Sequence, residues 1–116
     1  MSDKSIFSKI IDGEIPADKL YEDDQCIVIQ DIQPKAPTHL LIIPKQPIPM
    51  LVEARPEHQA LLGHLLLVVG EMARRTGCED GFRLVINNGE GGGQTVFHLH
   101  MHLLGNKKFD EDDLAS

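Results

Sequence analysis

The stretch that decides the fold is Phe97–Leu104, which reads F-H-L-H-M-H-L-L. Successive side chains of a β-strand point to opposite faces, so a strand would place His98, His100 and His102 together on one face. The apolar side chains that would then enter the core are Phe97, Leu99, Met101 and Leu103. A helix would scatter the three histidines around its axis. The stretch therefore predicts a strand, which we extend to Val96–Leu104.

Outward from this strand, short apolar runs separated by turn residues predict four more strands and two helices. We expect strands at Lys19–Glu22, Cys26–Ile32, Thr38–Ile43 and Phe82–Asn87, and helices at Ser5–Ile15 and Pro56–Thr76. Ser5 is a suitable N-cap. In the long helix, one wide apolar face, which includes Leu66, could cover a sheet. Several connections are too short for parallel crossovers, which predicts an α+β fold with a five-stranded antiparallel sheet.

Length and composition predict a single domain over residues 1–116, with a C-terminal tail at 105–116 that is partly flexible. The net charge of −7 argues against a nucleic-acid-binding surface, although the run Asp110–Asp113 supplies four of the negative charges. No apolar stretch is long enough for a membrane span, and the first residues lack a signal-peptide pattern. Two isolated cysteines suit a reducing compartment, so we expect a cytoplasmic protein.

The row of histidines is open to three interpretations. It could be a solvated strand face, or a metal site in which two of the histidines join a distant ligand such as His39. The third interpretation is a nucleophile that attacks phosphorus, because neutral imidazole is available near pH 7. The preceding loop, Gly89–Gly93, suits this chemistry because glycines let backbone N–H groups approach an anion. Gln94 and Thr95 would add an amide and a hydroxyl.

The segment Gly93–Leu104 resembles the signature of the histidine triad (HIT) proteins, in which three histidines alternate with apolar residues. The segments Ile6–Ile11, Glu14–Ala17 and Asp31–His39 are similar to the Hint branch, the histidine triad nucleotide-binding proteins. The resemblance implies a homodimeric purine nucleoside phosphoramidase, in which one sheet runs continuously across the dimer. Such enzymes cleave P–N bonds of adenosine or guanosine 5′-monophosphoramidates, and also hydrolyse aminoacyl adenylates.

The resemblance also implies a role for individual residues. His100 would be the nucleophile that forms a covalent nucleotidyl-histidine, with His98 orienting it, His102 contacting the phosphate, Thr95 near the leaving group and His39 behind the triad. Asp31 would hold the ribose hydroxyls. Other nucleotide contacts would come from Gly93, Gln94 and Asn87, and from an apolar purine slot formed by Ile6, Phe7, Ile10, Ile15, Ile29 and Ile32.

Several alternatives stay open at this stage. A dinucleoside polyphosphate hydrolase of the same family, or a non-catalytic nucleotide sensor, would use the same motif. Some HIT proteins carry a structural zinc with cysteine ligands, but the lack of paired cysteines argues against one here. We therefore expect no cofactor and no metal, and ligands of the AMP, GMP and adenylate type.

Overall fold

The computed structural model describes residues 4–114, and its core is one antiparallel sheet. The strands are β1 (Lys19–Glu22), β2 (Cys26–Gln30), β3 (Thr38–Pro44), β4 (Phe82–Val85) and β5 (Met101–Gly105), in the spatial order β1-β2-β3-β5-β4. The five-stranded antiparallel prediction is confirmed. Residues 1–3 and 115–116, which the predicted domain 1–116 and tail 105–116 include, lie outside the described residues.

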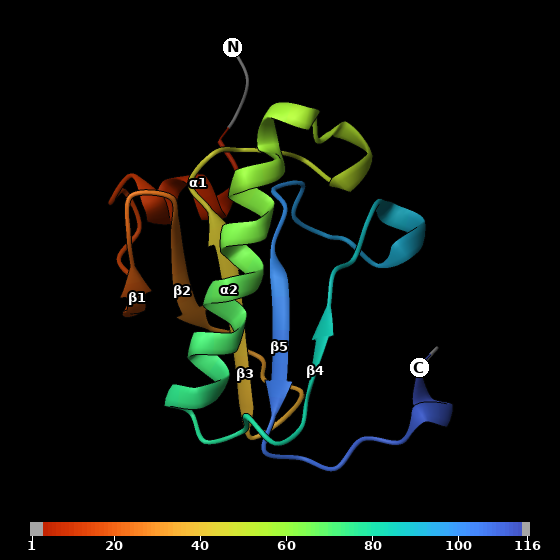
Figure 1. The fold of residues 1–116 in the computed structure, drawn as a ribbon. Coiled ribbons are helices and arrows are strands. Elements are labelled where there is room, and N and C mark those ends of the chain that lie inside the picture. The colour runs from red at the N-terminus through yellow and green to blue at the C-terminus, as the bar shows by residue number, and fades with distance from the viewer. Residues whose placement is uncertain (1–3, 115–116) are drawn as a thin grey trace.

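The two helices pack on opposite faces of the sheet. The long helix α2 (Gln59–Arg75) lies across the face that Figure 1 turns toward the viewer. It buries Leu65 and its neighbours against Val28, Leu40 and Met101. On the other face, α1 (Ile6–Ile11) packs Phe7 and Ile10 on the alternate residues of β2 and β3. The sheet therefore has α2 on one face and α1 on the other.

Both helices are shorter than predicted. Ser5 does cap α1, since its hydroxyl accepts the Ser8 N–H, but the helix ends at Ile11, because the chain turns away at Gly13 with φ of 81°. The first residues of the predicted long helix, Pro56–His58, form a 3₁₀ turn instead. There the imidazole Nδ1 of His58 accepts the Arg55 N–H at 2.9 Å. The side chain of Leu66, which we predicted on the buried face, is 52% exposed.

The predicted strands differ from the observed ones mainly at their ends. The strand predicted at Cys26–Ile32 ends at Gln30, where the Asp31 carboxylate accepts the Gln33 N–H and turns the chain. The strand predicted at Phe82–Asn87 ends at Val85. Gly105, assigned to the tail, belongs to β5 and pairs with both neighbouring strands.

The largest correction concerns the stretch Val96–Leu104. Its paired part, β5, begins only at Met101, and Phe97 is 49% exposed instead of buried. Before β5, the Leu99 N–H donates to the Ile48 carbonyl at 2.7 Å, so this part of the chain is held by a loop and not by a strand. The alternation still holds, because Leu99, Met101 and Leu103 are buried in the core under α2.

Among the described residues, none of the helices has the length and apolar character that a membrane span requires.

Candidate active site

The three histidines converge on the α1 side of the sheet. His102 lies in β5, and the other two precede that strand. The rings of His100 and His102 are 4.9 Å apart, and the edge of Phe7 packs on His100 at 4.8 Å. His98 and His100 are both buried, which removes the solvated-face interpretation. Burying polar rings requires hydrogen-bond partners, and these partners fix the state of each imidazole.

His98 is held as a neutral ring by partners on both nitrogens. Its Nε2 lies 2.7 Å from the Pro44 carbonyl, which can only accept, so Nε2 carries the proton and donates. Its Nδ1 then accepts from the hydroxyls of Ser5 at 3.0 Å or Ser8 at 3.2 Å. Burial lowers the pKa of His98, which keeps the ring neutral near pH 7.

His100 is oriented by the backbone of His98. Its Nδ1 lies 2.8 Å from the His98 carbonyl oxygen, so Nδ1 carries the proton and donates. The tautomer leaves the lone pair on Nε2, which makes no hydrogen bond within the described part of the chain. A neutral imidazole with one nitrogen anchored and the other free is the form that attacks an electrophile.

His39 and His102 form a directed chain of hydrogen bonds. The Lys35 N–H donates to Nδ1 of His39 at 2.9 Å, so the proton of that ring is on Nε2. Nε2 of His39 lies 2.9 Å from Nδ1 of His102 and donates to it. The remaining proton of His102 must therefore be on its Nε2. Among the described residues, this Nε2 is the one buried side-chain polar atom without a partner.

The Nε2–H of His102 is a buried donor that has no acceptor among the described residues. Burial, together with the neighbouring His100 and His39, lowers the pKa of His102 to about 4. Burial also lowers the pKa of His39, against a smaller opposing effect of Asp31. Both rings are therefore neutral near pH 7. A buried unpaired donor costs about 1–3 kcal/mol, so an anion that accepts from it recovers that free energy on binding.

The backbone of the glycine-rich loop Gly89–Gly93 offers fewer free N–H donors for a phosphate than predicted. Glu90–Gly92 form a 3₁₀ turn, in which the N–H groups of Gly92 and Gln94 donate to the Gly89 carbonyl. The Gly93 N–H donates to the Glu90 carbonyl at 3.0 Å. The predicted phosphate donors at Gly93 and Gln94 are thus already used within the loop itself.

The side chain of Gln94 is also committed to the loop. It is 3% exposed, its Oε1 accepts the Gly89 N–H, and its Nε2 donates to the carbonyls of Pro49 and Val96. We correct the prediction that this amide faces a phosphate: it braces the loop. Thr95 is exposed beside it and can meet a ligand. Gly93 lies against the Asn87 side chain, whose Cγ a Cβ at Gly93 would approach to 3.9 Å.

The residues predicted at the nucleoside end divide into two groups. Phe7, Ile10 and Ile29 are buried in one apolar cluster of the core, against which the partly buried Ile15 packs. Ile6 and Ile32 are 49% and 95% exposed and can contact a ligand directly.

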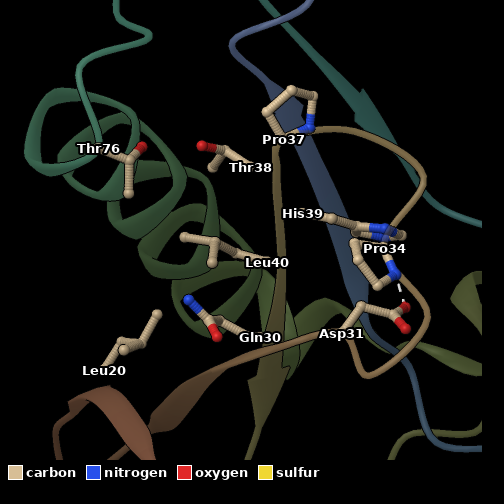
Figure 2. Close-up of a pocket in the computed structure, with 9 residues that line it drawn as sticks. All are labelled: Leu20, Gln30, Asp31, Pro34, Pro37, Thr38, His39, Leu40 and Thr76. Atoms are coloured by element: carbon tan, nitrogen blue, oxygen red, sulfur yellow. Dashed lines mark ion pairs between the residues drawn. The ribbon is translucent and has the colours of Figure 1, made fainter.

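Asp31 lies next to His39, with Oδ2 at 3.4 Å from Nε2 of that ring. Figure 2 shows both residues at a pocket of about 170 Å³, which the loop with Pro34 and Pro37 borders. None of the three triad histidines lines this pocket.

The hydrogen bonds argue against a metal site formed by Asp31, His39 and His102. Asp31, His39 and His102 each offer one ligand atom within 4.8 Å of the others. However, the Lys35 N–H fixes a proton on Nε2 of His39, and a metal ligand would need the lone pair at that nitrogen. The three residues are arranged as a relay of hydrogen bonds.

Sequence reasoning missed three supporting groups. Ser8, the Lys35 N–H and the Pro44 carbonyl fix the rings of His98 and His39, but none of them stands out in the sequence. Ser5 was assigned only as a helix cap, and it also reaches His98.

Comparisons with known proteins identify the family of the chain. The HIT domain model matches residues 12–109. An uncharacterized HIT-like protein of Synechococcus elongatus is 60% identical over 92% of this chain and 94% of its own length. The purine nucleoside phosphoramidase of Escherichia coli is 47% identical over 92% of this chain and 91% of its own.

Solved structures agree as well. A HIT family hydrolase from Legionella pneumophila superimposes with a TM-score of 0.90 at 41% identity, covering 93% of this chain and 97% of that one. Together with the phosphoramidase name, this similarity supports a hydrolase. The domain match, the sequence relatives and the fold all lead to one assignment: the chain belongs to the histidine triad (HIT) family.

Proposed function

We propose that this hydrolase cleaves the P–N bond of purine nucleoside 5′-monophosphoramidates, and also hydrolyses aminoacyl adenylates, through a covalent intermediate on His100. The observation that carries the proposal is the pair of complementary tautomers. His100 presents a lone pair at Nε2, while the neighbouring His102 presents a buried, unpaired N–H. A phosphate group needs both, a nucleophile for phosphorus and a donor for its oxygens.

In the first step, Nε2 of His100 attacks the α-phosphorus and forms an N–P bond, while the bond to the leaving nitrogen breaks. The leaving nitrogen keeps the electron pair and takes a proton from solvent, with the exposed Thr95 hydroxyl hydrogen-bonded to it. In the second step, water attacks phosphorus, the bond to His100 breaks, and the proton of the water goes to solvent. The nucleoside monophosphate leaves, and Nε2 regains its lone pair.

The charges of the side chains around His100 support the proposed reaction. The rings of His39, His98 and His102 are neutral, because burial lowers the pKa of each. The phosphate would therefore be stabilised by oriented neutral donors such as the His102 N–H. Such donors interact strongly with an anion where burial limits contact with water. Asp31, the one carboxylate that we assign to the site, would accept from the ribose hydroxyls, away from the phosphate.

The chain is also proposed to act as a homodimer with one continuous sheet. β4 is an edge strand with β5 as its neighbour in the sheet. The outer surface of α2 exposes Leu66 and Leu67 at 52% and 75%. A symmetric dimer would cover an edge strand and exposed leucines at once. Light scattering coupled to size exclusion, at concentrations spanning two decades, should give twice the chain mass.

The decisive comparison is between adenosine 5′-phosphoramidate and diadenosine polyphosphates as substrates. We expect release of AMP from the phosphoramidate to be the faster reaction, and His100→Ala to abolish it while AMP still binds. Faster turnover of the dinucleotides would assign the chain to polyphosphate hydrolysis instead. Tight AMP binding without turnover of any adenylate would identify a nucleotide sensor.

A further inference from the structure

A second cluster of chemically active side chains lies on the opposite face of the sheet from the triad. Asp23 stands in the turn between β1 and β2, Cys26 begins β2, and His64 projects from α2. Each offers one ligand atom, and the three atoms lie within 4.8 Å of one another. Carboxylate oxygen, thiol sulfur and imidazole nitrogen are ligands that zinc-type sites use, and here the imidazole comes from a different segment than the other two.

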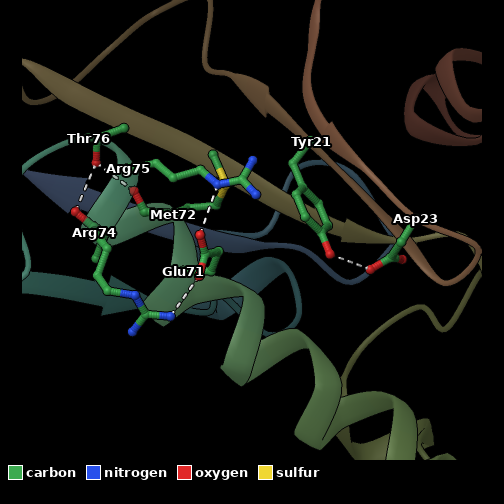
Figure 3. A network of polar contacts seen from close by, with 8 residues as sticks. Tyr21, Asp23, Glu71, Met72, Arg74, Arg75 and Thr76 are labelled. Carbon is green, nitrogen blue, oxygen red and sulfur yellow. Dashed lines mark hydrogen bonds and ion pairs between the residues drawn. The ribbon is translucent and has the colours of Figure 1, made fainter.

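The carboxylate of Asp23 is fixed before any ion arrives. Its Oδ1 accepts the N–H groups of Gln25 and Cys26, both at 2.8 Å. Its Oδ2 accepts from the Tyr21 hydroxyl at 2.8 Å, the contact that Figure 3 shows, and lies 2.6 Å from Nε2 of His64. A carboxylate held in this way presents one oxygen in a constant direction, as outer partners do for metal ligands in general.

His64 can change its tautomer when an ion binds. Its side chain is 30% exposed, and its Nδ1 has no hydrogen-bond partner in the described part of the chain. When an ion replaces the proton between Nε2 and Oδ2, the ring can carry its proton on Nδ1, where water can accept it, and Nε2 can offer its lone pair to the ion. This property separates the cluster from Asp31, His39 and His102, where the Lys35 N–H holds the tautomer.

We propose that Asp23, Cys26 and His64 bind a zinc-type divalent cation, with water as the fourth ligand, and tie α2 to the turn between β1 and β2. Tetrahedral Zn²⁺ with bonds of about 2.0–2.3 Å sets neighbouring ligand atoms roughly 3.3–3.6 Å apart. Nε2 and Oδ2 must therefore separate by less than about 1 Å from their present contact, which the exposed His64 ring allows.

Binding displaces one proton from the thiol. Burial and the nearby Asp23 raise the pKa of Cys26 to about 12, so the free protein holds a thiol at neutral pH. The ion takes the place of that proton, the sulfur becomes a thiolate ligand, and the proton goes to solvent. The site departs from our expectation of a metal-free chain, which rested on the lack of paired cysteines.

The test uses Co²⁺ as the probe, because a thiolate bound to Co²⁺ gives a sulfur-to-metal charge-transfer band that imidazole and carboxylate ligands do not give. We expect the full-length protein to bind one equivalent with this band, and Zn²⁺ to abolish the band by displacing Co²⁺. Cys78→Ser is the matched control, since Cys78 is the other buried cysteine and lies outside the cluster. His100→Ala tests whether the ion sits in the triad, and both variants should keep the band.

Cys26→Ser should lose the band. His64→Gln, at a partly exposed helix position, should weaken Co²⁺ binding by at least about tenfold and should still fold. The proposal is overturned if the wild type gives no thiolate band at saturating Co²⁺, or if Cys26→Ser keeps it. If Cys26→Ser does not fold, His64→Gln decides, and unchanged affinity in that variant overturns the proposal equally. None of these readouts depends on catalytic activity.

Discussion

Replacing His39 tests whether the tautomer of His102 is imposed from outside the triad. His39→Ala removes the donor that lies 2.9 Å from Nδ1 of His102, so that ring becomes free to place its proton on either nitrogen. His39→Gln removes the ring but keeps an amide N–H near the position of Nε2. Both variants lose the acceptor of the Lys35 N–H. Both variants should therefore lose stability, and His39→Ala should lose more, because the shorter side chain also leaves a cavity where the buried ring stood.

Activity should separate the two variants. Removing one donor to the charge of a transition state costs about 10²–10³ in kcat. In His39→Ala the His102 ring remains and only its orientation is released, so we expect a loss of about 10- to 100-fold, as for outer partners of histidine ligands. His39→Gln should recover most of this loss in activity.

The assay is kcat/KM for adenosine 5′-phosphoramidate beside urea unfolding of each variant. The relay is refuted if His39→Ala stays within about twofold of wild type, which is under about 0.5 kcal/mol of transition-state stabilisation. It is refuted equally if His39→Gln is as slow as His39→Ala, because the donor would then have no role.

Two further predictions concern stability. A Cβ at Gly105 would lie 2.5 Å from Sγ of Cys78 in a strand paired on both sides, so Gly105→Ala should lower the free energy of unfolding by about 1–3 kcal/mol. Gly91→Ala, where a Cβ meets nothing within 4 Å, should change it by less than about 0.5 kcal/mol, and equal effects would contradict the packing argument. Stability should also fall between pH 7 and pH 5, because the unfolded rings take up protons near pH 6.5 while the pKa of His102 is held to about 4 in the folded state. The loss for this partly exposed ring is about 1–2 kcal/mol after solvent screening, and urea unfolding that gave equal or greater stability at pH 5 would refute it.

The sequence predicted the face of each histidine but not the extent of the strand. Alternation requires only an extended chain, and His98 and His100 satisfy it before β5 begins. Whether an extended segment pairs with a neighbouring strand depends on the segments that pack beside it. Here the Leu99 N–H donates to the carbonyl of Ile48, in a loop that is far away in the sequence. The exposure of Phe97 has the same origin, since this residue lies where the chain is not yet part of the sheet.

Hydrogen-bond partners were the least predictable part of the site. The composition of the glycine-rich loop indicates donors, but the side-chain amide of Gln94 satisfies buried groups instead. The relay from Lys35 through His39 to His102 joins residues far apart in sequence. Local patterns predicted the elements, while these roles depend on tertiary contacts.

Trapping the covalent intermediate tests the central claim most directly. Rapid quenching of wild-type enzyme with adenosine 5′-phosphoramidate, followed by peptide mass spectrometry, should find one AMP group on the imidazole of His100. His100→Ala should form no adduct and release no AMP while it still binds AMP. An adduct on another residue, or unchanged AMP release by His100→Ala, would contradict the account.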